Sequence, residues 1–429
     1  MSELFLIRGG EVVDSGGRRR ADVLVGEDGL VEAVGEDIDV SAAEIDAGGC
    51  VVAPGLVDLH AHLREPGREE AETVETGSRA AALGGYTAVV AMPNTEPAID
   101  SAGVVREVQQ LGAKALCDVR PAGAITLDRA GEALAPLAEM ADLGVRLFTD
   151  DGAGVQDDGL MRRAMEYASG LPQPVVLAQH CEVASLSAGG HMHEGAVSSR
   201  LGIPGIPAAA EEMMIARDVA LARIAGARLH FQHLSTGESL RLVGEARAAG
   251  LPVTAEVAPH HFTLTDAEVE GYDPVFKVNP PLRPPDDVAA VRSALASGAV
   301  DAIATDHAPH PQEAKQQAFE EAPPGMIGLE TALALALTEL ELGLEDVLAL
   351  MSWQPADIAG IADEHGGPIS EGRPANLCVI DPAATWTVDP ARTASRSRNN
   401  PYAGRSLTGR VRHTILRGEP VVLDGEAQR

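Results

Sequence analysis

The chain has 429 residues, 45% of them hydrophobic, and a formal net charge of −31. This length exceeds one small domain and suits a large barrel joined to a smaller module. The negative charge argues against nucleic acid or an anionic membrane as a partner, so an anionic substrate would need local cationic groups to bind it.

The sequence has none of the features that mark membrane or exported proteins. No apolar run is long enough to span a bilayer. The first residues lack a basic flank followed by a long apolar core, so we expect no secretory signal. The cysteines, Cys50, Cys117, Cys181 and Cys378, are scattered and form no Cys-x-x-Cys pair. We therefore expect a reduced, cytoplasmic protein.

Both ends of the chain are expected to form short β-strands. Apolar runs bounded by Gly and Asp occur at residues 4–8, 11–13, 22–25, 31–34, 375–380, 411–416 and 420–423. Because chain termini often lie close together, we predict that both ends build one small β-module.

Short apolar runs alternate with Ala-, Leu-, Glu- and Arg-rich helical stretches between these ends. The runs cover residues 51–57, 86–90, 145–148, 174–178, 227–231, 253–257 and 301–304. Strand–helix alternation predicts a parallel sheet, and this many strands favours a (β/α)8 barrel with one strand unassigned. An open doubly wound sheet is the alternative, although no Gly-x-Gly-x-x-Gly opens the first helix.

Two histidines stand at the end of the run at 51–57. His60 and His62 are two residues apart, so their side chains lie on one side of a strand and can reach one metal ion. A lone His-x-His pair is weak evidence, because such pairs are also common in cores and on surfaces.

Polar side chains also concentrate at the ends of the later runs, which form the active-site face of a barrel. In chain order, the set comprises Asp58, His60, His62, Arg64, Asn94, Asp150, Asp151, His180, His233, His260, His261, Asp306, His307 and His310. Four His and two Asp suffice for two metal ions, because zinc accepts imidazole nitrogen and carboxylate oxygen and one carboxylate can bridge two ions.

Several motifs in these positions resemble dihydroorotase, in the long class I bacterial form of the amidohydrolase superfamily. They are His60-Ala61-His62-Leu63-Arg64-Glu65-Pro66-Gly67, Met92-Pro93-Asn94-Thr95, Thr149-Asp150-Asp151-Gly152, Gln179-His180-Cys181-Glu182, Asn279-Pro280-Pro281-Leu282-Arg283 and Ala304-Thr305-Asp306-His307-Ala308-Pro309-His310. The resemblance spans residues 8–422. It implies a TIM-like (β/α)8 barrel at 55–365 and a composite β-sandwich from 1–54 plus 366–429.

The resemblance also implies a two-zinc site. His60, His62 and Asp306 would hold one Zn²⁺, His180 and His233 the other, with Asp151 and a hydroxide as bridges. Spacing alone cannot separate Asp150 from Asp151, and the choice rests on the family pattern. Related enzymes bridge with a carboxylated lysine, but none of the three lysines, Lys114, Lys277 and Lys315, sits at that strand end.

The implied reaction is the reversible hydrolysis of (S)-dihydroorotate to N-carbamoyl-L-aspartate, a step of pyrimidine synthesis. The bridging hydroxide would be the nucleophile and Asp306 the general base and acid. Arg64 would bind the substrate carboxylate with Asn94 and His310, and His62 would bind the substrate as well as the metal. Asn279 and the backbone at Pro324 and Gly325 would hold the ring, under a loop at 311–325 that closes on the substrate.

The remaining polar residues are expected to support the site. His260, His261 and His307 would pack or support the ligands, and Asp58 would orient a ligand histidine. Two other functions stay open: a hydantoinase-like or allantoinase-like enzyme, and an inactive structural partner of aspartate transcarbamoylase. For partners, the resemblance implies a homodimer and allows association with that transcarbamoylase.

Overall fold

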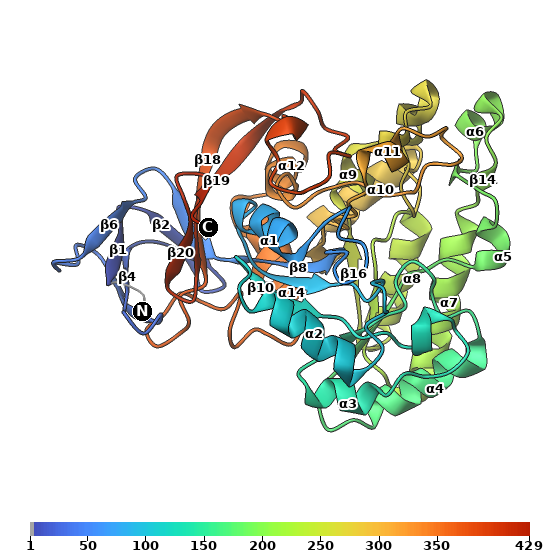
Figure 1. The fold of residues 1–429 in the computed structure, drawn as a ribbon, viewed down its shortest axis with the longest axis horizontal. Coiled ribbons are helices and arrows are strands. Elements are labelled where there is room, and N and C mark those ends of the chain that lie inside the picture. Colours follow the sequence, from blue (N-terminus) through green and yellow to red (C-terminus); the bar gives the residue numbers. More distant parts are fainter. Residues whose placement is uncertain (1–3) are drawn as a thin grey trace.

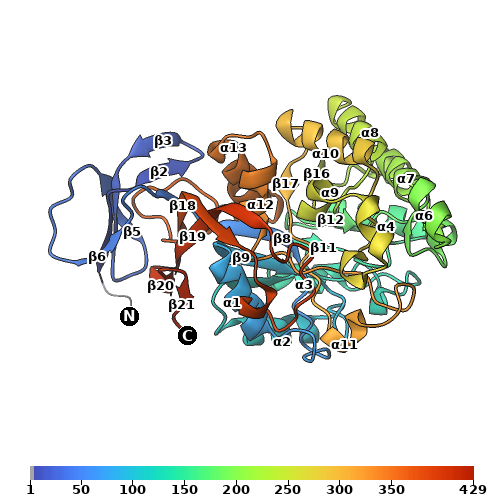
Figure 2. The same ribbon diagram turned by 90° about the horizontal axis from the view of Figure 1, so that it is seen from above.

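The computed structural model describes residues 4–429, and in this part of the chain eight parallel strands close into a barrel (Figures 1 and 2). The strands, in barrel order, are β8 (Leu56–Ala61), β9 (Tyr86–Ala91), β10 (Asp118–Pro121), β11 (Leu147–Phe148), β12 (Val176–Gln179), β15 (Leu229–Phe231), β16 (Val253–Val257) and β17 (Ala302–Ile303). Parallel bridges from Gly123 to Phe148 and from Ala61 to His307 join the two halves and complete the ring. The predicted barrel is confirmed, and the open sheet was wrong.

Helices surround the barrel because each strand is followed by a segment with one apolar face. The outer helices are α1 (Val74–Leu83), α2 (Ala102–Gly112), α3 (Leu137–Asp142), α4 (Asp158–Ser169), α7 (Ala209–Ala225), α8 (Gly237–Ala248), α10 (Pro285–Ala296), α12 (Ala332–Glu339), α13 (Leu344–Leu348) and α14 (Gln354–Ile358). Some of these helices are capped at their start: the Asp157 side chain accepts from Leu160 N in α4, and that of Thr236 from Ser239 N in α8. Helix α7 ends at Gly226, whose φ of 69° suits a residue without a side chain.

Shorter elements lie in the segments that connect these strands and helices. They include α5 (Ala184–Ser187), β13 (Met192–His193), α6 (Ala196–Leu201), β14 (Gly205–Ile206), α9 (Pro259–Thr263), α11 (Gln312–Lys315) and the single turns η1 (Leu127–Arg129), η2 (Asp266–Gly271), η3 (Pro274–Phe276), η4 (Ala349–Trp353) and η5 (Pro390–Arg392). Among residues 4–429, no helix combines the length and apolar character needed to cross a bilayer.

Both ends of the chain form the second layer, a β-sandwich that lies beside the barrel (Figure 1, blue and red strands). One sheet has the order β5 (Val31–Gly35), β4 (Asp22–Val25), β1 (Phe5–Arg8) and β6 (Ala43–Asp46). The other has the order β21 (Glu426–Ala427), β20 (Glu419–Leu423), β19 (Ser406–Leu416), β18 (Leu377–Thr387), β7 (Val51–Pro54), β2 (Glu11–Asp14) and β3 (Gly17–Arg20). Ile7, Val23, Val52, Val379 and Ile415 meet in its core, which confirms the composite sandwich. The domain boundaries given above stay predictions.

Two strand predictions were wrong in detail. The run at 51–57 is not one strand: β7 pairs with β18 in the sandwich, and β8 begins after Gly55 in the barrel. The unassigned eighth strand is β10, which is short and carries charged side chains. Asp118 contacts His365 at 2.9 Å and Arg120 contacts Glu364 at 2.7 Å, so partners distant in sequence neutralise a segment that does not look like a strand.

Candidate metal and substrate site

The predicted histidine and aspartate ligands meet at the carboxyl ends of the barrel strands. His60 lies in β8 and His62 just beyond it, while Asp151, His180, His233 and Asp306 follow β11, β12, β15 and β17. All six side chains are buried. Two groups have ligand atoms within 4.8 Å of one another: one contains His60, His62 and Asp151, and the other Asp151, His180 and His233.

Asp151 is the member that the two groups share. Its Oδ1 lies 3.3 Å from His60 Nε2, 3.6 Å from His180 Nδ1 and 3.7 Å from His233 Nε2, while its Oδ2 lies 3.6 Å from His62 Nε2. Asp151 thus faces histidines of both groups, the position that a bridging carboxylate requires.

Asp150 points away from the histidines. Its carboxylate accepts hydrogen bonds from Ile125 N, Thr126 N and the Thr126 hydroxyl, so it fixes the loop after β10. The two neighbours that spacing could not separate therefore have different surroundings, and only Asp151 lies among the histidines.

Asp306 lies on the other side of the first group. Its Oδ1 is 3.2 Å from His62 Nε2 and 3.7 Å from His60 Nε2, and its Oδ2 is 3.9 Å from His260 Nε2. Burial raises the pKa of Asp306, but the hydrogen bond with His62 and the nearby charges of His60 and His233 outweigh it and hold the pKa below its usual range. The carboxyl group is therefore ionised at neutral pH.

The donor set fits a divalent cation such as zinc. His60 Nε2 and Asp151 Oδ1 are buried without a hydrogen-bond partner, which is costly for polar atoms unless something else binds them. Burial lowers the pKa of His180, but Asp151 and Glu182 raise it to about 10, so a cation competes with protons for these nitrogens. The chemistry of the set, imidazole nitrogen and carboxylate oxygen, is that of zinc ligands.

Side chains behind the first group set its imidazole tautomers. His60 Nδ1 is 2.8 Å from Glu256 Oε1 and His62 Nδ1 is 2.9 Å from Asn94 Oδ1. Each Nδ1 donates to these acceptors, so each Nε2 faces the carboxylates of Asp151 and Asp306 and would be available to a cation bound among them.

Glu256 is the supporting carboxylate that the sequence did not reveal. It lies inside β16, where it binds His230 Nε2 at 3.0 Å as well as His60. Asp58, the residue predicted for this role, instead accepts from His60 N at 3.3 Å and Thr305 N at 2.9 Å. Asp58 thus joins the backbones of β8 and the segment after β17, and it contacts the ligand His60 through the backbone amide rather than the ring. Its role in orienting a ligand histidine stays a prediction.

We expect Glu256→Gln to weaken metal binding by about 10- to 100-fold, the usual cost of losing a carboxylate behind a ligand histidine. The substitution keeps an acceptor for His60 Nδ1 but removes the charge. Metal content after dialysis against graded chelator measures the change. Glu245→Gln, at an exposed carboxylate on α8, is the matched control. Equal metal retention in both variants would contradict the role of Glu256.

The predicted substrate-binding residues surround this cluster. Arg64 is 6% exposed, and its Nε donates to Pro309 O at 3.2 Å. Burial lowers the pKa of Arg64 to about 10, so the guanidinium keeps its charge. Burial and the charge of Arg64 lower the pKa of His310 to about 3, so its ring is neutral, and its Nε2 donates to Pro324 O at 2.8 Å.

Asn94 and Asn279 each use one atom of the side-chain amide in a hydrogen bond and leave the other without a partner. Asn94 uses its oxygen for His62, and the structure gives no partner for its Nδ2. Asn279 uses its Nδ2, which donates to Glu182 Oε2 at 2.6 Å, while its Oδ1 is buried without a partner. Glu182 also lies 3.5 Å from His180 Nε2, so this acid connects a predicted metal ligand to a predicted substrate contact. The sequence motif contained Glu182, but nothing in it indicated this role.

Gly325 is arranged differently from the prediction. Its amide donates to Lys277 O at 2.9 Å, and its carbonyl accepts from Asn399 Nδ2 at 3.1 Å and Lys315 Nζ at 3.1 Å. Its backbone groups are therefore engaged within the protein and do not face a ring. The prediction that the backbone at Pro324 and Gly325 holds the substrate ring stays a prediction.

Backbone strain is present at several of these positions. Arg64, His233 and Asp306 have φ values of 63°, 35° and 46°, a region that side-chain-bearing residues rarely adopt. Such strain persists where the surroundings fix the conformation, and it is common at functional sites. The other histidines are packed as expected: His307 contacts Glu72 at 3.3 Å, and His261 Nε2 contacts Pro280 O at 3.1 Å.

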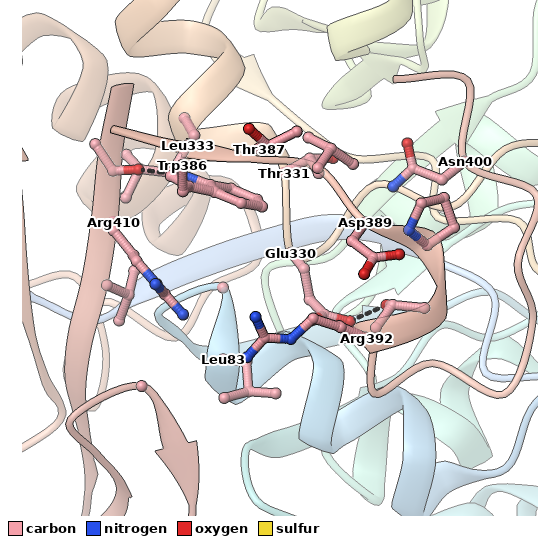
Figure 3. Close-up of a pocket in the computed structure, with 18 of the residues that line it drawn as sticks. Leu83, Glu330, Thr331, Leu333, Trp386, Thr387, Asp389, Arg392, Asn400 and Arg410 are labelled. Atoms are coloured by element: carbon pink, nitrogen blue, oxygen red, sulfur yellow. Dashed lines mark hydrogen bonds between the residues drawn. The ribbon is translucent and has the colours of Figure 1, made fainter. Parts of the chain in front are cut away.

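A separate cavity lies between the long β18–β19 hairpin and α12 (Figure 3). It has a volume of about 740 Å³ and is lined by Leu333, Trp386, Arg392 and Arg410 among others. None of the predicted site residues lines it. The His/Asp cluster is thus enclosed by the barrel loops and distinct from this surface feature.

Known proteins resemble the chain both in sequence and in structure. A family model described as Dihydro-orotase-like matches residues 49–239. Dihydroorotases from Streptomyces coelicolor and Mycobacterium tuberculosis are 52% and 48% identical, each over 98% of this chain and 99% of that protein. The L-hydantoinase (dihydropyrimidinase) from Arthrobacter aurescens has a TM-score of 0.89 at 27% identity, with 100% of this chain and 98% of that one covered. The dihydropyrimidinase from Brevibacillus agri has a TM-score of 0.87 at 24% identity, with 99% and 96% covered.

A (β/α)8 barrel with a composite sandwich and a His/Asp cluster at its strand ends defines the amidohydrolase fold. The sequence identity to dihydroorotases, which extends over nearly the full length of the chain, narrows the class further. The chain belongs to the dihydroorotase family and is a cyclic amide hydrolase.

Proposed function

We propose that the protein catalyses the reversible hydrolysis of (S)-dihydroorotate to N-carbamoyl-L-aspartate in pyrimidine synthesis. The observation that carries this proposal is Arg64. Within residues 4–429, no carboxylate lies within 4 Å of this buried guanidinium. Nearby acidic side chains such as Asp306 and Glu182 contact histidines instead. A buried, unpaired charge is costly, so the site favours an anionic ligand beside Arg64. The ring carboxylate of dihydroorotate meets this need with a bidentate pair.

We propose that His60, His62 and Asp306 hold one zinc ion, and His180 and His233 a second, with Asp151 between them. Zinc ions bound there would lower the pKa of water and polarise the amide carbonyl. Glu256 and Asn94 keep the ring nitrogens of His60 and His62 in the tautomer that binds a cation.

Asp306 is the proposed proton carrier. Its carboxylate is ionised and lies beside His62, so it is ready to take a proton from the attacking water. It then gives that proton to the amide nitrogen as the ring C–N bond breaks, and the new carboxyl group releases the second proton of the water to solvent and becomes a carboxylate. The reverse reaction uses the same group as acid and base in the opposite order.

Arg64 and the free amide of Asn94 bind the ring carboxylate in this account, with the neutral His310 beside them. The unpartnered Oδ1 of Asn279 accepts a ring N–H. These contacts fix the ring so that its amide carbonyl faces the His/Asp cluster, and orientation of this kind lowers the barrier.

The alternatives are less well supported. The hydantoinases share the fold, but their identity to the chain is about half that of the dihydroorotases. An inactive scaffold is disfavoured because every predicted ligand is present and the two groups converge. A homodimer, association with aspartate transcarbamoylase and a cytoplasmic location stay predictions.

We expect Arg64→Met to lower kcat/KM for dihydroorotate by about 10- to 100-fold, because it removes charge-assisted hydrogen bonds to the carboxylate. Binding of dihydrouracil, which lacks that carboxylate, should change little. Arg68→Met, at an exposed arginine of the same loop that pairs with Glu96, is the control. If Arg64→Met weakened the interaction with dihydroorotate and with dihydrouracil equally, Arg64 would only support the fold.

A further inference from the structure

Two of the three lysines in the chain are buried close to the predicted loop. Lys277 is 6% and Lys315 9% exposed, whereas Lys114 is exposed. Among residues 4–429, no carboxylate lies within 4 Å of either buried ammonium group, as the ion pairs of the structure show. Buried lysines are rare, and an unpaired one requires other partners.

Lys315 has backbone carbonyls as those partners. Its Nζ donates to Lys277 O at 3.4 Å, Pro323 O at 3.0 Å and Gly325 O at 3.1 Å. An ammonium group has three N–H donors, so the three carbonyls match its capacity. These bonds tie the end of α11 to the backbone ten residues later.

Lys277 holds the middle of the same segment. Its Nζ donates to Phe319 O at 2.8 Å and Glu320 O at 2.9 Å, and it lies 3.3 Å from His191 Nδ1. The ammonium is also 5.6 Å from the centre of the Phe319 ring. The two lysines together fix the backbone of residues 319–325 from within the protein.

This segment is in direct contact with the predicted substrate site. Pro324 O accepts from His310 Nε2, and Arg64 Nη2 lies 3.5 Å from the same nitrogen. Gly325 has a φ of 143°, and a side chain there would approach His310 Nε2 at 2.8 Å and Ala308 O at 2.9 Å. The position of residues 323–325 thus determines where the His310 ring stands.

The site below the segment is enclosed. His62, Arg64, Asp151 and Asp306 are each at most 6% exposed, so the barrel loops, including residues 319–325, shape the access of a substrate to these side chains. Residues 319–325 are held there by the ammonium–carbonyl bonds of the two lysines and by the packing of buried Phe319 against Met192, Ile203 and Val269.

We propose that Lys277 and Lys315 are positioning residues that hold residues 319–325 closed against His310, and that this closure sets the affinity for the substrate carboxylate. The second part rests on the proposed function, while the first part does not. Neither lysine touches the predicted metal ligands. Their effect on the reaction is therefore indirect, through Pro324, Gly325 and His310.

Amine labelling of the whole protein tests the closure without any assay of activity. A limiting amount of an acetylating reagent is added, and peptide mass spectrometry follows each lysine. Lys315 should react at least about tenfold more slowly than Lys114. Burial and the charge of Lys277 lower the pKa of Lys315 to about 7, which makes the free amine more abundant, so slow labelling reports inaccessibility rather than protonation.

A variant and a ligand should change the labelling rate of Lys315 in opposite directions. Lys277→Met should speed the labelling of Lys315, because it releases residues 319 and 320. In the native protein, added dihydroorotate should slow the labelling of Lys315 below its rate without ligand. Labelling of Lys315 as fast as that of Lys114 would overturn the closure, whether or not the protein hydrolyses dihydroorotate.

Kinetics tests the effect on the substrate. Lys315→Met should raise KM for dihydroorotate about tenfold with a smaller change in kcat and with unchanged metal content, because the metal ligands are untouched. Lys315→Arg should recover part of the loss, and Lys114→Met should behave like the native enzyme. Native KM in Lys315→Met, or an equal fall of kcat and metal content, would contradict a positioning role.

Discussion

Asp306→Asn is expected to lower kcat for dihydroorotate by about 10²- to 10⁴-fold, the usual contribution of a positioned acid–base group. Asparagine has nearly the same shape and keeps an oxygen toward His62, but it cannot accept a proton. The metal content should therefore stay near that of the native protein. Steady-state kinetics together with elemental analysis measures both quantities on the same sample.

The values of kcat and metal content in Asp306→Asn together decide the role of Asp306. A large loss of kcat with native metal content supports proton transfer. A parallel loss of metal would assign Asp306 to metal binding alone, and native kcat with native metal would remove it from the reaction. Thermal unfolding of the variant guards against a general loss of structure.

Asp151→Asn is expected to weaken metal binding at both groups, by more than the roughly 10- to 100-fold cost of losing an outer carboxylate. The reason is geometric: Asp151 is the one residue that both His groups share, with Oδ1 near His60, His180 and His233. Its loss should abolish most of the activity with it. Metal titration of the chelated protein measures the number of ions bound and their affinity.

Asp150→Asn is the matched comparison because it changes the adjacent residue in the same way. Asp150 binds Ile125 N and Thr126 N, so its substitution should lower the free energy of unfolding by about 1–3 kcal/mol and leave the metal content unchanged. If Asp150→Asn lost metal and Asp151→Asn did not, the assignment of the bridge would be reversed.

Much of the site could be predicted because its residues follow strands in a regular way. His60 and His62 share one side of a strand by the two-residue period, and His180 and His233 each follow a short apolar run. A parallel barrel then brings these ends together. The choice between Asp150 and Asp151 needed the resemblance to the family, since the two occupy the same strand end.

The residues that were missed act across long sequence separations. Glu256 lies within an apolar strand and contacts His60, 196 residues away, so nothing local marks it. Strand β10 carries Asp118 and Arg120, whose partners include His365 and Glu364 in a distant part of the chain. Only the folded barrel shows that these charges are neutralised.

The similarity to hydantoinases shows how little the fold alone says about the substrate. The barrel and the sandwich are common to both groups, so specificity has to come from a few side chains around the cluster. Arg64 is the most informative of these, because no carboxylate of residues 4–429 lies within 4 Å of its buried charge. Lys277 and Lys315 would affect specificity indirectly, because they fix the backbone that contacts His310, next to Arg64.

Hydrolysis of dihydroorotate, dihydrouracil and allantoin by zinc-loaded protein, beside a chelated control, is the most direct measurement of the proposed function. We expect turnover of dihydroorotate alone, with loss of that activity on chelation and recovery on return of zinc. Preference for an uncharged ring would contradict the dihydroorotase assignment and the role of Arg64, and turnover that survives complete removal of metal would contradict the metal site.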